Sequence, residues 1–268
     1  MATVARIALN VFRESVRDKV LYNLVFFAVL LIAASFLLGQ LTAGQEVKII
    51  KDLGLAATAL FGLFMAVFIG IGLVSKEVER RSIYSLLSKP MTRTEFLLGK
   101  YAGLVLTLLV NVTVMSASLL VVLAVMNWIT PEASARAAEA PAVDPSLLKA
   151  LALIFVELMI VTGVALLFST FSSPLLSAAL TLGTYITGHF NADLKNFDKV
   201  TDSVVAGWLG KGVYYLLPNL QPFDVKAQVV HGEPVTWGYL GLTAAYGFTY
   251  VALLLIVATF IFGRRDFK

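Results

Sequence analysis

The sequence contains no cysteine and only two histidines among its 268 residues. Without thiols, the chain can form neither disulfide bonds, thiolate metal sites nor cysteine nucleophiles. His189 and His231 have no partner at metal-ligand spacing, so we interpret both as ordinary membrane-interface residues. The six methionines are scattered and form no cluster typical of a copper site. We therefore expect no metal site in this chain.

Charge is also scarce. Asp, Glu, Lys and Arg make up 14% of the residues and hydrophobic residues 59%, whereas a soluble domain carries about 25% charged residues. The sequence therefore predicts an integral membrane protein. It shows no periodic alternation of polar and apolar residues, which argues against a β-barrel. The net charge of +4 is too small to suggest binding to nucleic acid.

The motifs of nucleotide hydrolysis and of nucleophilic catalysis are absent. Gly99-Lys100 and Gly210-Lys211 both lack the rest of the G-x-x-x-x-G-K-[ST] pattern of a P-loop. No G-x-S-x-G elbow and no Ser/His/Asp arrangement is present. We therefore expect that the chain is not an enzyme and binds no cofactor of its own.

Long apolar runs define the predicted fold. A hydrocarbon core of about 30 Å needs about 20 helical residues, and six runs reach or approach this length. They predict one all-α transmembrane domain over residues 1–268, in which the fifth span is the shortest. The six predicted spans cover residues 20–41, 53–74, 98–127, 147–170, 174–190 and 237–262. No small-residue cleavage site follows the first run, so we interpret it as a retained helix.

The basic residues predict the orientation. With the N-terminus inside, the inner pieces are residues 1–20, 75–100, 171–173 and 263–268. These pieces hold 13 of the 21 Lys and Arg residues, and eight of the nine Arg residues. Because loops that stay in the cytoplasm are enriched in Lys and Arg, both termini are predicted to lie inside.

The segments outside the spans also carry signals. Residues 2–19 place Val4, Ile7, Ala8, Val11 and Phe12 on one helical face, which predicts a helix lying in the membrane interface. The alternative is a simple positive flank of the first span.

The outer loops 129–146 and 190–236 are long enough for short helices, and the second contains an apolar stretch at residues 216–220 that is too short to span. We expect that stretch to form a partly buried or re-entrant helix. Trp208, Tyr214, Tyr215 and Trp237 suit a membrane interface.

The second span carries small residues at a spacing of four. Gly54, Thr58, Gly62, Ala66 and Gly70 form one narrow face of the kind that lets helices approach closely. Phe61, Phe64 and Phe68 present bulk on other faces. One interpretation is a packing seam with lipid-facing aromatic residues, and the other is a helix that lines a pathway against a partner subunit.

Polar residues within the spans leave two further alternatives. Ser177, Thr181 and Thr184 of the fifth span either bond their own helix backbone or line a polar cavity. Glu157 is the one charged residue well inside a predicted span. It either contacts a substrate or ion, or reaches toward the membrane surface or bonds a neighbouring Ser or Thr.

The most highly charged stretch, residues 76–100, lies between the second and third spans. Ile83, Leu86 and Leu87 form one apolar stripe of a short helix, which Pro90 ends because proline has no N–H. Thr92 and Glu95 then read as a capping box that opens the next helix.

This stretch resembles the loop between the second and third spans of ABC-2 type permeases, the membrane subunits of one class of ATP-binding-cassette transporters. The family pattern is matched by Glu79, Ser82-Ile83, Leu86-Leu87-Ser88, Pro90-Met91-Thr92-Arg93, Glu95 and Phe96-Leu97-Leu98-Gly99-Lys100. One departure is Arg81, where many members have Gly, and it leaves the local turn open. Shorter likenesses occur at residues 171–174, at residues 217–223 and at residues 262–267. Within the family, the chain resembles permeases of copper-site maturation systems of nitrous oxide reductase, a likeness that does not identify its substrate.

The resemblance implies six spans and a cytoplasmic coupling helix, within the loop at residues 75–97, that docks on a separate ATPase. Ile83, Tyr84, Leu86 and Leu87 would supply its apolar anchors, and Glu77, Glu79, Arg80 and Arg81 its charged rim, with Pro90 and Arg93 joining it to the third span. ATP and Mg would bind to that ATPase. A second permease copy or a related permease would complete the transporter, which would export its substrate across a bacterial or archaeal cytoplasmic membrane.

The resemblance also implies that the second and fifth spans face the pathway. This favours a pathway role for Phe61, Phe64, Phe68, Glu157, Ser177, Thr181 and Thr184. Two alternatives stay open. In one, the permease passes ATPase motion to an outer accessory protein through residues 190–236 without transport. In the other, the chain is a stand-alone secondary transporter, for which Glu157 is the one intramembrane charge available.

Overall fold

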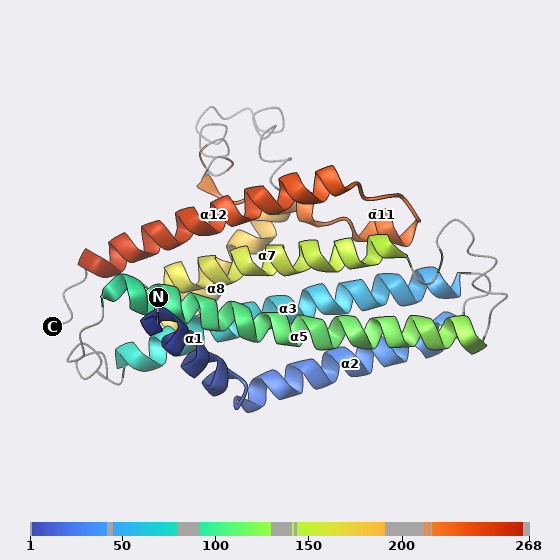
Figure 1. The fold of residues 1–268 in the computed structure, drawn as a ribbon, viewed down its shortest axis with the longest axis horizontal. Coiled ribbons are helices and arrows are strands. Elements are labelled where there is room, and N and C mark those ends of the chain that lie inside the picture. Colours follow the sequence, from blue (N-terminus) through green and yellow to red (C-terminus); the bar gives the residue numbers. More distant parts are fainter. Residues whose placement is uncertain are drawn as a thin grey trace.

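The computed structural model describes residues 2–41, 45–79, 92–129, 141, 144–190, 212, 214 and 216–264, with residues 72–79 described as helical backbone. All regular secondary structure in this part of the chain is helical. Five long helices run side by side along the length of the molecule (Figure 1). They are α2 (Lys19–Gln40), α3 (Glu46–Glu79), α5 (Arg93–Ile129), α7 (Pro145–Ser169) and α12 (Trp237–Arg264), and each is long and apolar enough to cross a membrane.

The sixth predicted span is the shorter helix α8 (Pro174–His189). Its 16 residues extend about 24 Å at 1.5 Å per residue, which is less than the hydrocarbon core of a bilayer. Local signals explain where these helices start. Asp144 caps α7 by accepting a hydrogen bond from the Ser146 amide (2.8 Å), and prolines occupy the first helical positions of α7 and α8.

The helix that contains the second predicted span extends beyond that span at both ends. The second span was expected to start at residue 53, but α3 already begins at Glu46. Lys51, which the hydropathy argument placed outside the span, is fully buried in the first part of this helix. The helix also continues beyond the predicted end of the span, to Glu79.

Helices α3 and α7 form the centre of the bundle. In the spans of both, 72% of the most apolar window is buried, compared with 22% in α2 and 28% in α5 and α12. The small-residue face of α3 makes this packing possible. A Cβ atom on Gly70 would lie 2.7 Å from Cβ of Ala165 in α7, and a Cβ on Gly62 would overlap Leu158 of the same helix. This confirms the packing-seam interpretation of the small residues.

The N-terminal helix α1 (Ala2–Ser15) crosses α5 at one end of the bundle (Figure 1). Gly99 and Gly103 of α5 let it approach, since a Cβ on either would come within 2.7 Å of Ile7 or Val11. The predicted N-terminal helix is therefore confirmed over Ala2–Ser15, and its apolar face packs on α5. Its place in a membrane interface stays a prediction.

Candidate functional site

The candidate site forms where α8 ends. The Leu220 amide donates to the Gly188 carbonyl (3.0 Å), so residues 218–220 run directly against the last turn of α8. Gly188 permits this approach, because a Cβ there would lie 2.8 Å from both Pro218 O and Leu220 Cγ. Leu220 is buried, as expected for a partly buried segment. The helix expected over residues 216–220 is only partly present, because Leu216 is helical and residues 217–220 are not.

Three tyrosines of α12 hold this irregular segment in place. Tyr250 donates to the Leu216 carbonyl (2.8 Å), Tyr246 accepts from the Asn219 amide (2.9 Å), and Tyr239 donates to the Pro222 carbonyl (2.7 Å). Irregular backbone at membrane depth is tolerated only where protein groups satisfy its polar atoms. The three tyrosines supply such groups from one face of α12, because they are spaced seven and four residues apart.

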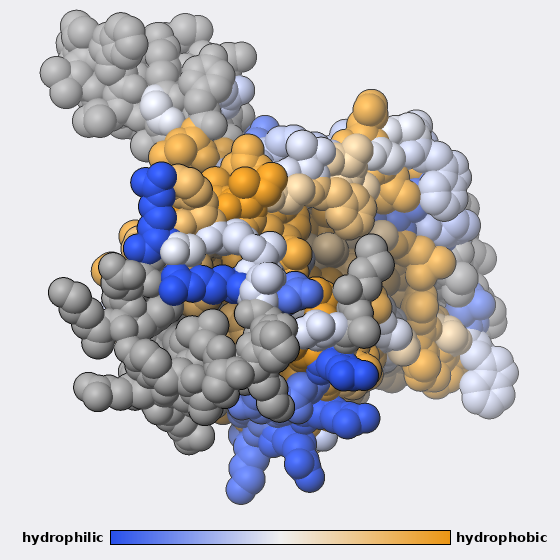
Figure 2. Space-filling model, turned by 60° about the vertical axis from the view of Figure 1, so that its left-hand side comes forward, coloured by the Kyte–Doolittle hydropathy of each residue, from blue (hydrophilic) through white to orange (hydrophobic). Residues whose placement is uncertain are grey.

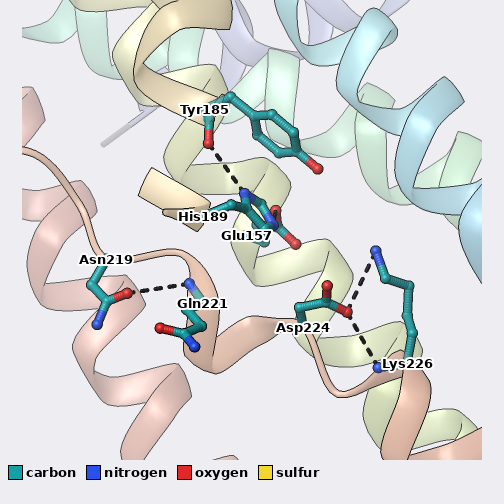
Figure 3. Close-up of polar contacts among 7 residues, drawn as sticks. All are labelled: Glu157, Tyr185, His189, Asn219, Gln221, Asp224 and Lys226. Carbon is teal, nitrogen blue, oxygen red and sulfur yellow. Dashed lines mark hydrogen bonds and ion pairs between the residues drawn. The ribbon is translucent and has the colours of Figure 1, made fainter. Parts of the chain in front are cut away.

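Beyond this segment the chain forms the one-turn helix η2 (Gln221–Phe223) and the short helix α11 (Lys226–Val230). Phe223 is fully buried and anchors η2 in the core. The Asn219 side chain accepts from the Gln221 amide (3.2 Å), and the Lys226 side chain lies 3.5 Å from the Asp224 carboxylate (Figure 3). Residues 216–226 therefore bring polar and charged side chains close to the end of α8.

Glu157 lies at the centre of this polar region, on α7 and only 2% exposed. Its Oε1 is 3.3 Å from Nε2 of His189 and makes no aligned hydrogen bond with any residue that the structure describes. Tyr185, Asp224 and Lys226 lie within electrostatic range of the Glu157 carboxylate. Figure 3 shows Tyr185 and His189 converging on Glu157 from α8.

The second nitrogen of His189 fixes the ring. Its Nδ1 lies 3.1 Å from the carbonyl oxygen of Tyr185, one turn earlier in α8, and the two rings are 4.5 Å apart between centroids. If Nδ1 donates to that carbonyl, Nε2 carries no proton in the neutral ring. A protonated ring donates at both nitrogens and pairs with the carboxylate. His189 Nε2 and Glu157 Oε1 can therefore hold a proton between them, or together bind a polar group.

The sequence interpretation of His189 as an ordinary interface residue is wrong, because the structure pairs it with Glu157 across two helices. The alternative in which Glu157 bonds a neighbouring Ser or Thr is not seen among the described residues, where the partner of its carboxylate is His189. His231 does resemble an interface residue: it is exposed and bonds only to its own helix turn, at Ala227 O (2.8 Å). No group of three or more His, Cys, Asp and Glu suited to a metal occurs among the described residues.

The hydroxyl residues of α8 lie in the interior of the bundle. Ser177, Thr181 and Thr184 are buried. Thr181 donates to Ser177 O (2.7 Å) and Thr184 to Leu180 O (2.8 Å), which is the local bonding that the sequence left as one alternative. The Ser177 hydroxyl also lies 2.6 Å from that of Ser172.

The phenylalanines of α3 have a different setting. Phe68 is 56% exposed, and Phe61 and Phe64 are half-buried. The residues proposed together for a pathway therefore divide between an outer aromatic face of α3 and the inner faces of α7 and α8. The pathway role of both groups stays a prediction.

The predicted ATPase-docking residues are mostly beyond the structural description. Glu77 and Glu79 belong to the last turns of α3, and their side chains are not described; Arg80, Arg81, Ile83, Tyr84, Leu86, Leu87 and Pro90 lie outside the described residues. Arg93 is described, and its Nη1 donates to the carbonyls of Phe262 (3.2 Å) and Gly263 (2.8 Å) in α12. Docking by these residues stays a prediction.

The start of α5 confirms the predicted capping box. The Glu95 carboxylate accepts from the Thr92 amide (3.0 Å), and the Thr92 hydroxyl accepts from the Glu95 amide (3.2 Å). Phe96 stacks on Phe262 at 6.0 Å between ring centroids. The first turn of α5 is thus capped by its own side chains and contacts the end of α12.

Comparison with known proteins gives the family. The family model described as ABC-2 family transporter protein matches residues 5–191, which run from α1 to the end of α8. No curated protein matches the chain. The finer likeness to permeases of nitrous oxide reductase maturation stays a prediction. With its apolar helices of membrane-spanning length and this match over more than half of its length, the chain belongs to the ABC-2 family as a multi-pass membrane permease of an ABC transporter.

Proposed function

We propose that this permease exports a substrate across a bacterial or archaeal cytoplasmic membrane, driven by a separate ATPase subunit that binds ATP and Mg. The observation that carries the proposal is the pair of helix ends around residues 80–91. Helix α3 continues unbroken to Glu79, and α5 restarts at its capping box at Thr92. A movement of the residues that connect α3 to α5 would therefore be transmitted directly to α3, the central helix of the bundle.

The orientation proposed from the sequence accords with this arrangement. Helix α1, the beginning of α5 and the end of α12 meet at one end of the molecule (Figure 1). Of the Arg residues in the described helices and turns, those at positions 6, 13, 93 and 264 belong to these elements, and Arg17 lies in the turn directly after α1. With this end inside, the positive-inside rule is satisfied. We count α8 together with residues 216–223 as the sixth crossing.

A second permease copy is part of the proposal. One face of α8 carries Leu175, Ala179, Gly183 and Ile186, all of them exposed, and nothing lies within 4 Å of a Cβ built on Gly183. Helix α3 contacts α8 and exposes Leu60 and Phe68. Two copies facing each other through these helices would enclose a pathway lined by Phe61, Phe64 and Phe68.

The ATPase part of the proposal is tested by charge reversal. Glu79→Lys and Arg81→Glu should each weaken co-purification of the ATPase encoded with this permease, because both alter the charged rim of the coupling loop. Asp52→Lys is the matched control, since Asp52 is an exposed acid near the other end of α3. If neither loop variant weakens the association, or if no ATPase co-purifies with the parent chain, the proposal is wrong.

A second candidate function is mechanical transmission to an outer accessory protein. It is favoured by the tyrosine bonds from α12 and by the Leu220–Gly188 contact, which together tie residues 216–223 to the spans. Motion of α12 or α8 would therefore move the outer segment. Reconstitution of permease and ATPase alone separates the two: substrate accumulation without an outer protein supports export, and its failure under ATP hydrolysis supports transmission.

A further inference from the structure

Helix α1 has three distinct sides, and in the part of the chain that the structure describes only one of them packs on another element. That side carries Ile7 and Val11, which lie against Gly99 and Gly103 of α5. Val11 is 5% exposed. Because successive residues turn by about 100° around a helix, residues three, four and seven apart share a side. The packed side therefore leaves most of the circumference of α1 facing outward.

Arginines occupy the side opposite to this packing. Arg6, Arg13 and Arg17 are all exposed, at spacings of seven and four residues that place them in one line. Arg17 extends the line through the turn after α1, where its amide still bonds to Glu14 O (3.1 Å). Within the residues that the structure describes, none of the three guanidinium groups forms an ion pair or hydrogen bond.

An apolar flank separates the arginine line from the packed side. Ala5 and Leu9 are exposed and Phe12 and Val16 are half-buried; Leu9 is 49% exposed. Figure 2, which turns this end of the molecule toward the viewer, shows hydrophilic side chains projecting beside apolar surface. An apolar strip next to a basic strip is the pattern of a helix that lies along a membrane, with one strip in the acyl chains and the other at the headgroups.

The position of α1 next to the first span also indicates a helix that lies along the membrane surface. Asp18 caps α2 by accepting from the Val20 amide (2.9 Å), so the span begins three residues after α1 ends. The first turn of α2 exposes Val20 and Tyr22, at 50% and 61%. In a membrane these side chains would face lipid at the edge of the predicted first span, and α1 would then lie at the level of the headgroups.

We propose that the Arg6, Arg13 and Arg17 line binds the phosphate groups of anionic phospholipids. A guanidinium group forms paired hydrogen bonds to phosphate oxygens and needs no further partner from the protein. The adjacent apolar flank favours lipid over a protein partner, because it offers acyl chains a surface beside the headgroup site. Helix α1 is fixed to α5 through Gly99 and Gly103, so bound lipid also holds the Arg93 end of α5.

The proposal is independent of the ATPase and is tested on the permease alone. The chain has no cysteine, so Asn10→Cys, at an exposed position beside the arginines, gives a single site for a fluorophore. The labelled full chain is reconstituted in vesicles of phosphatidylcholine and phosphatidylglycerol at a fixed ratio, with brominated chains on one lipid or the other. Stronger quenching by brominated phosphatidylglycerol measures enrichment of anionic lipid at α1.

The expected result is a several-fold preference for phosphatidylglycerol, within the bound of about fivefold for each basic side chain near an anionic surface. The preference should fall in 1 M salt, where the Debye length is about 3 Å. It should vanish when Arg6, Arg13 and Arg17 are all changed to Gln, and should be kept at least in part when all three are changed to Lys. A label at Leu242→Cys, exposed on α12, should show no preference in any chain.

Two results overturn the proposal. One is equal quenching by both brominated lipids in the parent chain. The other is a preference that persists in the triple Gln chain. If the Gln chain instead loses a co-purifying ATPase while the parent shows no lipid preference, the arginines belong to a protein interface and the lipid site does not exist. Because the three side chains are exposed, the Gln chain should fold normally, which its unaltered thermal transition checks.

Discussion

Replacing His189 tests whether Glu157 depends on it. The carboxylate is 2% exposed, and His189 Nε2 is the group 3.3 Å from its Oε1. Removing one partner of a buried charged pair costs about 3–5 kcal/mol, because the other charge is left unpaired. Because the imidazole is charged only when it is protonated, we expect His189→Leu to cost about 3 kcal/mol, at the lower end of that range.

The same substitution should cost less once the charge is gone. In the Glu157→Gln background, the neutral amide leaves no unpaired charge when His189 is replaced. His189→Leu then removes only the Nδ1 bond to Tyr185 O and some packing, at a cost of about 1 kcal/mol. The difference predicts a coupling energy of about 2 kcal/mol in a double-mutant cycle, within the range for residues in contact.

Thermal unfolding of the purified protein in detergent, followed by tryptophan fluorescence, measures the effect. About 1 kcal/mol corresponds to roughly 2–4 °C in a domain of this size class, so His189→Leu should lower Tm by about 6–12 °C. His231→Leu is the matched control. His231 makes the same bond to the carbonyl four residues earlier and has no ion pair with any described residue, so its Tm should hardly change. Equal costs of His189→Leu in both backgrounds would refute the pairing.

Three further predictions concern packing and hydrogen bonds, each checked by the same unfolding assay. Gly62→Val should destabilise by about 1–3 kcal/mol through overlap with Leu158, whereas Gly183→Val, whose Cβ meets nothing within 4 Å, should have no such effect. Tyr250→Phe should cost about 1 kcal/mol by removing the bond to Leu216 O, with Tyr22→Phe, on the exposed start of α2, as the neutral control. Thr92→Ala should cost about 1 kcal/mol through the lost cap of α5, and unchanged stability would show that the α12 contacts alone hold this end.

The start of α5 was predicted from the Thr92–Glu95 capping box, a local signal that the structure confirms. The starts of α7 and α8 also carry local signals, Asp144 with Pro145 and Ser173 with Pro174, but these spans were predicted from the apolar runs alone. Helix α3 begins before the predicted second span and carries Lys48, Lys51 and Asp52 in its first turns. A helix can carry such residues before it enters the apolar layer, and Lys51 is buried by neighbouring helices that hydropathy does not describe.

The contact between Glu157 and His189 could not be predicted in the same way. The two residues lie on different helices, and their distance depends on where α8 stops along α7. Nothing in the spacing of α8 marks His189 as different from the hydroxyl residues before it. The one available signal was that His189 follows Tyr185 by four residues, which places both side chains on one face of α8. This indication is weak, because many residue pairs in any helix have the same spacing.

In the proposed topology, with α8 as the sixth crossing, the shortness of α8 and the buried Glu157 are explained by one another. A helix of 16 residues ends before it has crossed a core of about 30 Å, so irregular backbone has to complete the crossing. Such backbone needs polar partners, and these are supplied by the α12 tyrosines and by the contact of Leu220 with Gly188. Polar side chains can therefore gather at this depth, and Glu157 lies where they do. A longer α8 would have covered Glu157 with an apolar helix face, and the charge would then have had no partner.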